Sequence, residues 1–322
     1  MTVLVTGGAG YIGSHTVRQF RQRQEEVVVL DSMEFGSRDA IADTPLVVGD
    51  IADSRLVAET VERFEVDAIV HFAAYKNAGE SFHNPGRYFH NNVAGTAHLL
   101  EAAHRAGVKH VVFSSTCAVY GTPDRAPVAE DAPIHPESPY GESKALVERM
   151  LHWYGVCHGM GSVSLRYFNA AGAAMDGSLG EDWTYSLNLV PVAMKALLGH
   201  APALKVFGTD YPTPDGTCIR DYIHVDDLAD AHLRALDYLR SGGATTAINL
   251  GTGTGSSVKE VLAAAQRAAG RPVPAEDSPR RPGDPVALWA DNRRAGELLG
   301  WKARYGLDDI VASAWKWHSA TA

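Results

Sequence analysis

Short apolar runs rich in β-branched residues recur along the first 113 residues of the chain, and stretches that favour helix separate them. Polar residues do not alternate within these runs, which is typical of strands buried on both faces of a parallel sheet. Repetition of strand, helix and strand predicts an α/β fold with a doubly wound parallel sheet. The predicted strands cover residues 3–5, 27–30, 46–48, 68–70 and 111–113, and a sixth covers residues 163–167.

This regular repetition ends after Asn169. The following segment is rich in Gly, Pro and Asp, with one helix predicted at about 189–198, and strand and helix then return at about 222–250. A Pro/Arg-rich segment and two short helices are expected after that. We therefore expect a domain built on the sheet and a smaller α/β lobe made of interleaved pieces. The domain is predicted at 1–169 plus about 222–250, and the lobe at 170–221 and 251–322.

A glycine-rich turn follows the first predicted strand and opens a helix. At such a turn, backbone N–H groups and the helix dipole can hold a pyrophosphate. Gly7, Gly10 and Gly13 have the spacing G-x-x-G-x-x-G. The second predicted strand ends in Asp31, whose carboxylate can accept hydrogen bonds from an adenosine ribose and would repel a 2′-phosphate. Together these features predict a Rossmann-type dinucleotide site that prefers NAD to NADP.

A tyrosine and a lysine lie four residues apart at the start of a predicted helix. Ser138 and Pro139 suit the N-cap and the first helical position, and good helix formers follow. Because positions i and i+4 share one face of a helix, Tyr140 and Lys144 are expected to point into the same space. On its own this short pattern more often describes a surface aromatic residue beside a solvated lysine. Only the rest of the chain can decide between the two.

Composition excludes several classes of partner. The net charge of −9 disfavours a general nucleic-acid surface, which needs a basic face. Cys117, Cys157 and Cys218 lie in irregular contexts that suggest neither a disulfide framework nor a zinc site. No apolar run approaches the ~20 residues that span a bilayer, and the chain begins directly with a strand and a glycine turn rather than a signal peptide. We expect a cytoplasmic protein with no membrane, nucleic-acid or metal site.

Long ordered blocks of the chain resemble one enzyme family. The glycine turn, the Tyr140/Lys144 pair and residues 113–116 resemble the extended short-chain dehydrogenase/reductase superfamily, and the match narrows to the UDP-glucose 4-epimerases. The resemblance implies bound NAD and reversible epimerisation at C4 of UDP-galactose and UDP-glucose through a transient 4-keto sugar. The blocks cover nearly the whole chain: VTGGAGYIGSH, HFAAYKNAGES, FSSTCAVYG, SPYGESK, LRYFNAAGA, DYPTPDGTCIRDYIHVDDLADAH and RRPGDPVALWAD.

The resemblance also implies roles for single residues. Tyr140 matches the acid/base that handles the proton of the sugar 4-hydroxyl. Lys144 matches the group that binds the nicotinamide ribose and lowers the tyrosine pKa. Thr116 matches a hydroxyl that bridges the sugar and the tyrosine. Arg220 and Arg281 suit a diphosphate, because a guanidinium fork matches its oxygens. The implied NAD contacts are Gly7, Gly10, Tyr11, Ile12, Gly13, Asp31, Ser32, Asp50, Ile51, Phe72, Ala73, Ala74, Lys76, Asn91, Ser114, Tyr140, Lys144 and Phe168, and the implied UDP-sugar contacts are Lys76, Thr116, Tyr140, Asn169, Asn188, Leu189, Phe207, Arg220, Arg281, Asp284 and Leu288.

Some of these polar residues have simpler readings. Asp50 is placed to reach the adenine, but it could equally cap the next helix. His71 and His224 lie at strand ends, where a histidine satisfied in the core is more common than a catalytic one. Residues 224–227, with the sequence His-Val-Asp-Asp, resemble a metal site superficially and are interpreted as a strand end followed by a helix cap.

The chain departs from the family pattern at a few positions. Leu187 stands where many relatives carry a second asparagine, which puts one polar substrate contact in doubt. Ser32 and Ala74 replace residues that are often Asn and Gly, and the loop at 32–44 is short. The short loop predicts an adenosine side that is more open.

Leu288 occupies the position that borders the 2-substituent of the sugar in the family. A tyrosine there excludes N-acetyl sugars and a small residue admits them, so the intermediate leucine implies weaker activity on UDP-N-acetylhexosamines. The alternative is that Leu288 simply packs in the core of the lobe.

Two other functions stay open. A dehydratase of nucleotide sugars needs an Asp-Glu pair directly after the threonine, where this chain has Cys117-Ala118, and a decarboxylase of UDP-glucuronate is a related alternative. A dinucleotide-binding protein without catalysis is the other, since fold does not imply function. The intact set of Thr116, Tyr140 and Lys144 argues against it. Relatives dimerise through two helices, and those predicted at about 85–106 and 140–156 are available, so the resemblance implies a homodimer.

Overall fold

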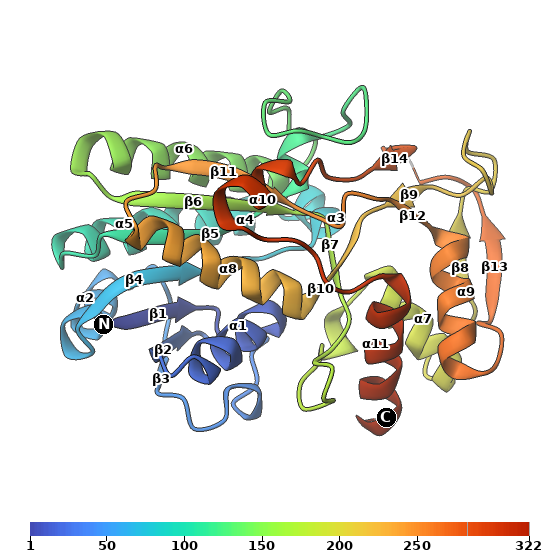
Figure 1. Cartoon of the computed structure of the whole chain (residues 1–322), viewed down its shortest axis with the longest axis horizontal. Helices are drawn as coiled ribbons and strands as arrows, with labels where there is room; N and C mark the ends of the chain where they lie inside the picture. The colour runs from blue at the N-terminus through green and yellow to red at the C-terminus, as the bar shows by residue number, and fades with distance from the viewer. Residues whose placement is uncertain (282, 322) are drawn as a thin grey trace.

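Seven parallel strands form the sheet at the centre of the larger part of the molecule (Figure 1). The computed structural model describes residues 1–281 and 283–321. Every predicted strand lies within a strand of this sheet, which confirms the doubly wound fold. In spatial order the strands are β11 (Thr246–Leu250), β6 (Gly161–Tyr167), β5 (His110–Thr116), β4 (Val66–His71), β1 (Thr2–Thr6), β2 (Glu26–Asp31) and β3 (Leu46–Val48).

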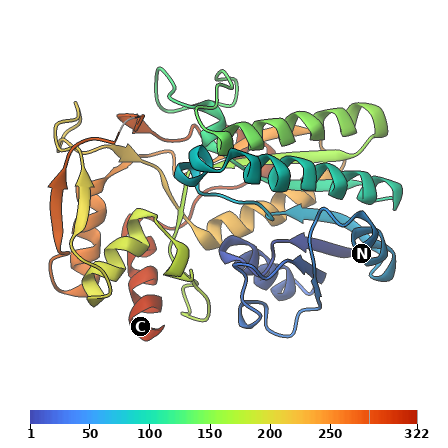
Figure 2. The ribbon, with the colours of Figure 1, turned by 180° about the vertical axis from the view of Figure 1, so that it is seen from behind.

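Helices cover both faces of this sheet, as the two opposite views show (Figures 1 and 2). Successive side chains of a strand point to opposite faces, and in β1 both Val3 and Leu4 are fully buried, Val3 beside Phe20 of one layer and Leu4 beside Leu99 of the other. Burial on both faces explains why the strands are apolar without alternation. One layer contains α1 (Tyr11–Gln22), α8 (Val225–Arg240) and α10 (Arg293–Leu299), and the other contains α2 (Ser54–Arg63), α5 (Thr96–Arg105) and α6 (Pro139–His158).

The helical segment predicted at 85–106 is present but not uniform. It consists of α4 (Pro85–Tyr88), the π-helical segment η2 (Phe89–Gly95) and α5. π-Helical turns often occur at functional sites. Here the turn buries Asn92, whose amide bonds to the backbone of Tyr75 and to the Ser143 hydroxyl of α6.

A smaller lobe is built on three helices and short strand pairs, at the right of Figure 1. Its helices are α7 (Leu189–Leu198), at the predicted place, α9 (Val258–Ala269) and α11 (Leu307–Thr321). Two short helices were expected after the Pro/Arg-rich segment, where α10 and α11 lie, and α9 was not predicted. Helix α9 begins with a capping box between Ser257 and Glu260. The strand pairs are β7 (Asn169–Ala171) with β10 (Tyr222–His224), β8 (Leu204–Phe207) with β13 (Ala275–Ser278), and β9 (Ile219–Arg220) with both β12 (Ser256–Ser257) and β14 (Ala287–Leu288).

Short elements complete the chain, and two predicted core histidines lie at strand ends. The short elements are α3 (Ala78–His83), η1 (Asp39–Ile41), η3 (Cys117–Tyr120) and η4 (Trp183–Tyr185). His71 is buried with both ring nitrogens hydrogen-bonded, one to Thr6 and the other to Thr96. His224 caps α8 by accepting from the Asp226 amide, so both interpretations from the sequence are confirmed.

Within residues 1–281 and 283–321, no helix is long and apolar enough to cross a membrane.

Candidate active site

The carboxyl ends of the central strands bring the predicted residues to one edge of the sheet. Gly7 follows β1, Asp31 ends β2, Phe72 follows β4, Thr116 ends β5 and Phe168 follows β6. In open α/β sheets, ligands bind outside this edge, where the order of the strands reverses. In the sheet β1 lies between β4 and β2, so the glycine turn after β1 lies between the loops that follow β4 and β2.

The glycine turn has the geometry that a pyrophosphate site needs. Gly7 has a φ of +70°, and a Cβ on it would lie 2.6 Å from the Ala73 amide nitrogen. A Cβ on Gly13 would lie 2.3 Å from the Gly7 carbonyl oxygen, whereas one on Gly10 would meet only that oxygen, at 3.3 Å, and otherwise fill open space. No side chain of the described residues caps α1, so the first amides of the helix are available to an anion. This cradle fits a dinucleotide phosphate.

Asp31 is held in place by backbone amides. One carboxylate oxygen accepts from the Ala9 amide at 3.0 Å and the other from the Met33 amide at 2.9 Å. This leaves acceptor capacity on both oxygens, which suits a ribose diol. Asp50 is exposed and accepts from the Ala52 amide at 2.8 Å, while Asp53 caps α2, so Asp50 is not the helix cap that the sequence left open.

The other predicted cofactor residues are spread along this edge. The Tyr11 hydroxyl donates to the Gly172 carbonyl at 2.6 Å, and Ile51 is buried in the core beneath the sheet edge. Phe168 is also buried, in a cluster that includes Leu288. The remaining residues lie in the first turn of α1, the loops after β2 and β4, and η2, and are Ile12, Ser32, Phe72, Ala73, Ala74 and Asn91.

Tyr140 and Lys144 lie one turn apart on α6, as predicted. Ser138 caps the helix by accepting from the Gly141 amide at 3.1 Å, and Pro139 is the first helical residue. The Lys144 ammonium donates to the Ser114 carbonyl at 2.8 Å. Both side chains therefore face the carboxyl end of β5, which carries Thr116, rather than solvent.

Burial dominates the titration of this pair. It raises the pKa of the Tyr140 phenol, as does the neighbouring phenol of Tyr167, while a hydrogen bond with Thr116 opposes the rise. Burial lowers the pKa of Lys144 to about 7, against the attraction of the Glu148 carboxylate. The amine thus changes charge near neutral pH, and a phenolate at Tyr140 depends on positive charge close to it.

Tyr167 is a site residue that the sequence analysis missed. It ends β6, its hydroxyl is 2.6 Å from the Ser114 hydroxyl, and it raises the pKa of Tyr140. Its position at the carboxyl end of a predicted strand, directly before Phe168 and Asn169, was the available signal.

Five predicted substrate residues come together in the lobe. The Arg281 guanidinium lies 3.9 Å from the centre of the Phe207 ring. A nitrogen of Arg220 lies 3.6 Å from an Asp284 carboxylate oxygen, and Leu288 is the register partner of Arg220 between β14 and β9. Two guanidinium groups, one of them beside an aromatic ring, suit a diphosphate joined to a flat base.

Asp221 ties this group to the sheet. Its carbonyl accepts from the Asn169 amide at 3.0 Å and its amide donates to the Leu288 carbonyl at 3.2 Å. Its buried carboxylate accepts from the amide and hydroxyl of Thr252, at 2.9 and 2.7 Å, and from the Ala290 amide at 3.1 Å. Asp221 thereby fixes two predicted substrate positions without carrying a predicted contact itself.

Other predicted residues are not joined to this group. The Lys76 ammonium is exposed and lies 3.7 Å from the carboxylate of Glu181, a buried residue that the sequence analysis missed. Asn188 is exposed just before α7, whose first residue is Leu189, and Leu187 beside them is 74% exposed.

A buried ion pair lies one turn beyond the lysine on α6. Glu148 accepts from the Ser115 hydroxyl at 2.5 Å and from Arg166 through two nitrogens, at 2.6 and 3.0 Å. Arg166 donates to the Tyr120 hydroxyl at 2.8 Å, which donates in turn to Asn249 at 2.8 Å. The network therefore joins α6 to strands β5, β6 and β11 next to Thr116.

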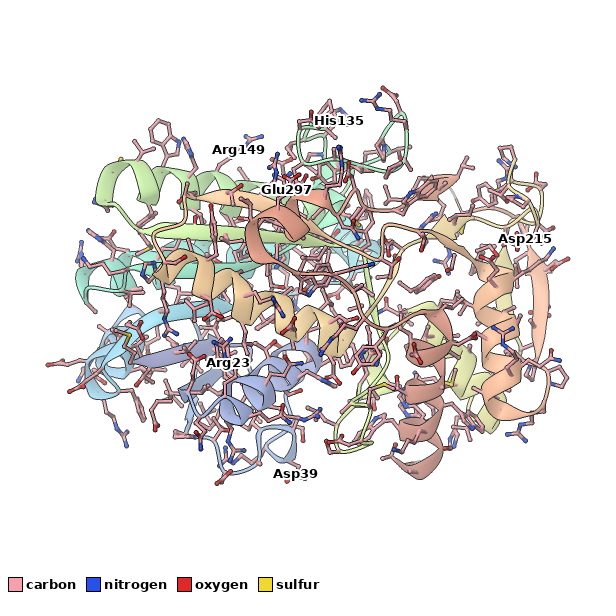
Figure 3. All side chains as sticks on the ribbon, viewed as in Figure 1. Arg23, Asp39, His135, Arg149, Asp215 and Glu297 are labelled. Atoms are coloured by element: carbon pink, nitrogen blue, oxygen red, sulfur yellow. The ribbon has the colours of Figure 1, made fainter. Side chains whose placement is uncertain are left out.

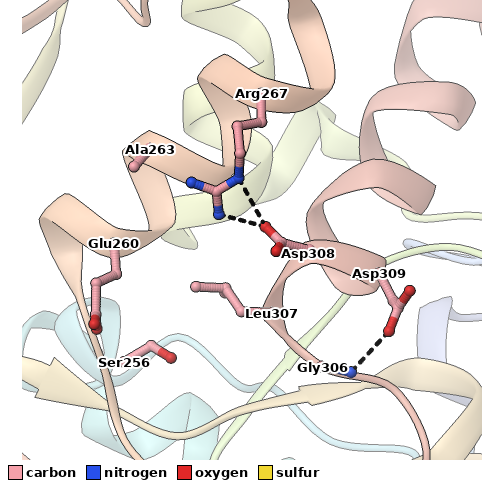
Figure 4. A pocket seen from close by; sticks show the side chains of 8 residues that line it. All are labelled: Ser256, Glu260, Ala263, Arg267, Gly306, Leu307, Asp308 and Asp309. Carbon is pink, nitrogen blue, oxygen red and sulfur yellow. Dashed lines mark hydrogen bonds and ion pairs between the residues drawn. The ribbon is translucent and has the colours of Figure 1, made fainter.

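A separate cavity of about 490 Å³ lies between α9 and α11 (Figure 4). Its charged groups are occupied by one another and by the backbone: Arg267 binds Asp308, Asp309 accepts from the Gly306 amide, and Glu260 accepts from Ser257 in the capping box. None of the predicted site residues lines it, so the edge of the sheet is the candidate site.

Known proteins are similar to this chain over nearly its full length. A family model described as the NAD dependent epimerase/dehydratase family matches residues 3–251. A UDP-glucose 4-epimerase of Streptococcus mutans is 48% identical over 324 residues, covering 99% of this chain and 97% of that protein. The structure of a UDP-glucose 4-epimerase from Brucella ovis in complex with NAD has a TM-score of 0.96 at 46% identity and covers 98% of this chain and 97% of its own. One from Bifidobacterium longum in complex with NAD+ and UDP has a TM-score of 0.94 at 39% identity, with coverages of 99% and 98%.

Proposed function

The chain belongs to the NAD dependent epimerase/dehydratase family, and we propose that it interconverts UDP-galactose and UDP-glucose by inverting C4 of the sugar. The observation that carries this proposal is the placement of Tyr140, Lys144 and Thr116 at the edge that also bears the glycine turn and Asp31. The cofactor is NAD, as in the related structures. An assay of the purified protein with UDP-galactose and UDP-glucose in both directions tests the proposal.

The chain's own residues move and hold the proton. Bound NAD would supply reversible acceptance of a hydride from C4 of the sugar. Tyr140 takes the proton of the 4-hydroxyl and returns it after the 4-keto sugar has turned its other face. Thr116 lies within hydrogen-bond reach of the phenol and orients it. The positive charge of Lys144 favours the phenolate.

The anionic part of the substrate is assigned to the lobe. Arg220 and Arg281 hold the diphosphate, and the Phe207 ring beside Arg281 suits the uracil base. Asp284 orients Arg220 through the ion pair described above. Asn169, Asn188, Leu189 and Leu288 complete the proposed UDP-sugar site.

We expect the purified protein to retain NAD rather than NADP, because the Asp31 carboxylate would repel a 2′-phosphate. Denaturation followed by chromatography of the released nucleotide identifies the cofactor. Asp31→Asn should weaken this preference, whereas Asp53→Asn, at an exposed helix cap of the same domain, should not. Release of NADP from the unaltered protein would contradict the assignment.

Leu288 is the residue to which we assign the choice of sugar. It is 8% exposed and packs with Val119, Tyr120 and Phe168 beside the strand of Arg220. A steric difference of this kind discriminates by only about 1–3 kcal/mol. We therefore propose UDP-galactose and UDP-glucose as the main pair and weaker activity on UDP-N-acetylgalactosamine.

Leu288→Tyr should abolish the N-acetyl activity and leave the hexose activity within about tenfold, because the added ring fills space beside the 2-substituent. Initial rates with both substrates measure the ratio. Leu288→Met, which conserves volume, is the control and should keep both activities. Equal loss of both activities in the tyrosine variant, together with a lower melting temperature, would show that Leu288 serves only the core.

The broader assignments are proposals of the same kind. We propose that residues 1–169 and about 222–250 serve the cofactor and that 170–221 and 251–322 serve the nucleotide sugar. We also propose a cytoplasmic homodimer. Its support is the outer face of α6, which bears Arg149 (Figure 3) and exposes Trp153 and Val156 by 61% and 63%. Light scattering measures the mass in solution.

A further inference from the structure

Two loops flank the glycine turn, and exposed side chains join them. One loop, residues 32–38, follows β2, and the other, residues 72–77, follows β4. Because β1 lies between β4 and β2 in the sheet, a dinucleotide held by the turn and by Asp31 occupies the space that these loops flank.

The first loop folds over the glycine turn. The Ser37 amide donates to the Ala9 carbonyl at 3.0 Å. A Cβ on Gly36 would lie 2.7 Å from the Ala9 Cβ and 3.0 Å from an Asp31 carboxylate oxygen. The loop thus packs directly against Ala9 of the glycine turn and against Asp31, while the openness of the adenosine side stays a prediction.

In the second loop, hydrogen bonds with the Asn92 side chain hold the backbone of Tyr75 in place. The Tyr75 amide donates to the Asn92 side chain at 2.9 Å, and the Asn92 amide group donates back to the Tyr75 carbonyl at 3.0 Å. Asn92 is 2% exposed and also donates to Ser143 of α6. The backbone at Tyr75 is therefore connected through Asn92 to α6, the helix that carries Tyr140 and Lys144.

Glu34 and Arg87 complete a bridge between the loops. Glu34 accepts from the Tyr75 hydroxyl and from Arg87, both at 2.6 Å. The Arg87 guanidinium also lies 3.8 Å from the centre of the Tyr75 ring and donates to Glu80 at 2.6 Å. The rings of Phe35 and Tyr75 are nearly perpendicular, with 6.2 Å between their centroids. We call Glu34, Tyr75 and Arg87 the clasp.

We propose that the clasp holds the two loops together beside Asp31 and thereby slows the release of bound NAD. The inference rests on the proposed function, in which a cofactor reduced in mid-cycle must stay bound until the sugar is reduced again. A single exposed ion pair contributes little. The clasp differs because a charged pair, a phenol hydrogen bond and a cation–π contact join Glu34 of the first loop, Tyr75 of the second loop and Arg87 of α4.

The rate of NAD release tests the proposal. Protein loaded with isotopically labelled NAD is mixed with excess unlabelled NAD, and the label that remains bound is followed by mass spectrometry. Glu34→Gln should release NAD roughly tenfold faster, the size expected when several exposed contacts are lost together. Tyr75→Phe, which keeps the ring and loses one hydrogen bond, should lie between this variant and the unaltered protein. Turnover per loaded site should not change.

Two comparisons separate the clasp from a general effect on the surface. Glu59→Gln breaks the exposed Arg55–Glu59 pair of α2, far from the loops in sequence, and should release NAD at the unaltered rate. Glu34→Gln combined with Arg87→Met should release NAD no faster than the more affected single variant, because both break one bridge. Additive acceleration would mean that the two residues act separately and would overturn the clasp.

The outcomes for clasp and function are distinct. If the unaltered protein binds no NAD, the proposed function fails. If it retains NAD and the clasp variants release it at the same rate, the clasp fails and the function stands. Variants with a lower melting temperature and an unchanged release rate would likewise overturn the clasp, since the bridge would then be only structural.

Discussion

Tyr140→Phe is expected to lower kcat by at least ~100-fold, in the range for loss of a general acid–base group. The phenylalanine ring fills the same space, so the affinity for UDP and the NAD content should stay close to those of the unaltered enzyme. Steady-state rates with UDP-galactose, titration calorimetry with UDP and analysis of bound nucleotide measure the three quantities. A loss confined to kcat is the signature of a group used in the reaction rather than in binding.

Tyr154→Phe is the matched control for that change. It lies on the same helix, and its hydroxyl donates to Glu101 of α5 at 3.1 Å. Removing that hydroxyl should leave kcat within about twofold, because it has no part in the proton transfer. Near-normal turnover in Tyr140→Phe would remove Tyr140 from the mechanism, whichever way the control behaves.

Arg166→Met is expected to destabilise the protein by about 3–5 kcal/mol, the usual cost of leaving a buried charge unpaired. The Arg166 side chain is 7% exposed, and the change leaves the Glu148 carboxylate without its guanidinium. Unfolding by urea and by heat measures the loss, which corresponds to roughly 6 °C or more in Tm. Because Glu148 also receives the Ser115 hydroxyl next to Thr116, kcat should fall as well.

A second substitution distinguishes charge from shape. Replacing both Glu148 and Arg166 by Met should recover part of the stability, since no unpaired charge is then buried. Arg55→Met, at the exposed pair of α2, should change stability by no more than about 0.5 kcal/mol. A single Arg166 variant as stable as the unaltered protein would show that the pair does not hold the strands to α6.

The sequence predicts those features that depend on neighbours along the chain. Strands appear as unbroken apolar runs because both faces of the sheet are covered, and the one-turn spacing of Tyr140 and Lys144 is set by the helix itself. Helix α9 was missed although Val258, Val261 and Leu262 give it an apolar face at helical spacing, and its capping box could also have been read. The glycine turn could be predicted because its conformation requires glycine: at Gly7 the positive φ and the close contacts admit no other residue, so the requirement is visible in the sequence.

Pairings between distant residues could not be predicted in this way. Arg220 with Asp284, and Glu34 with Arg87, join side chains that the topology alone brings together. The resemblance to the epimerase family implied Arg220 and Asp284 as two separate substrate contacts, not as a pair. It implied no role for Glu34 or Arg87. Asp221 was missed for a related reason: its partners are backbone amides and the hydroxyl of Thr252, 31 positions away, and neither can be recognised in the sequence.

The bonds of Asp221 also limit how the lobe can move. The chain passes between sheet and lobe near Asn169, near Asp221 and near Gly251, and again on either side of α10; the first three crossings meet at the carboxylate and backbone of Asp221. A Cβ on Gly251 would lie 2.2 Å from the Asp221 carboxylate, so the backbone at Gly251 packs tightly against Asp221. A body attached at three joined points cannot swing on one hinge. In the proposed reaction we therefore expect the lobe to keep a constant distance from the sheet, so that rotation of the sugar, rather than movement of the lobe, exposes the second face of the sugar.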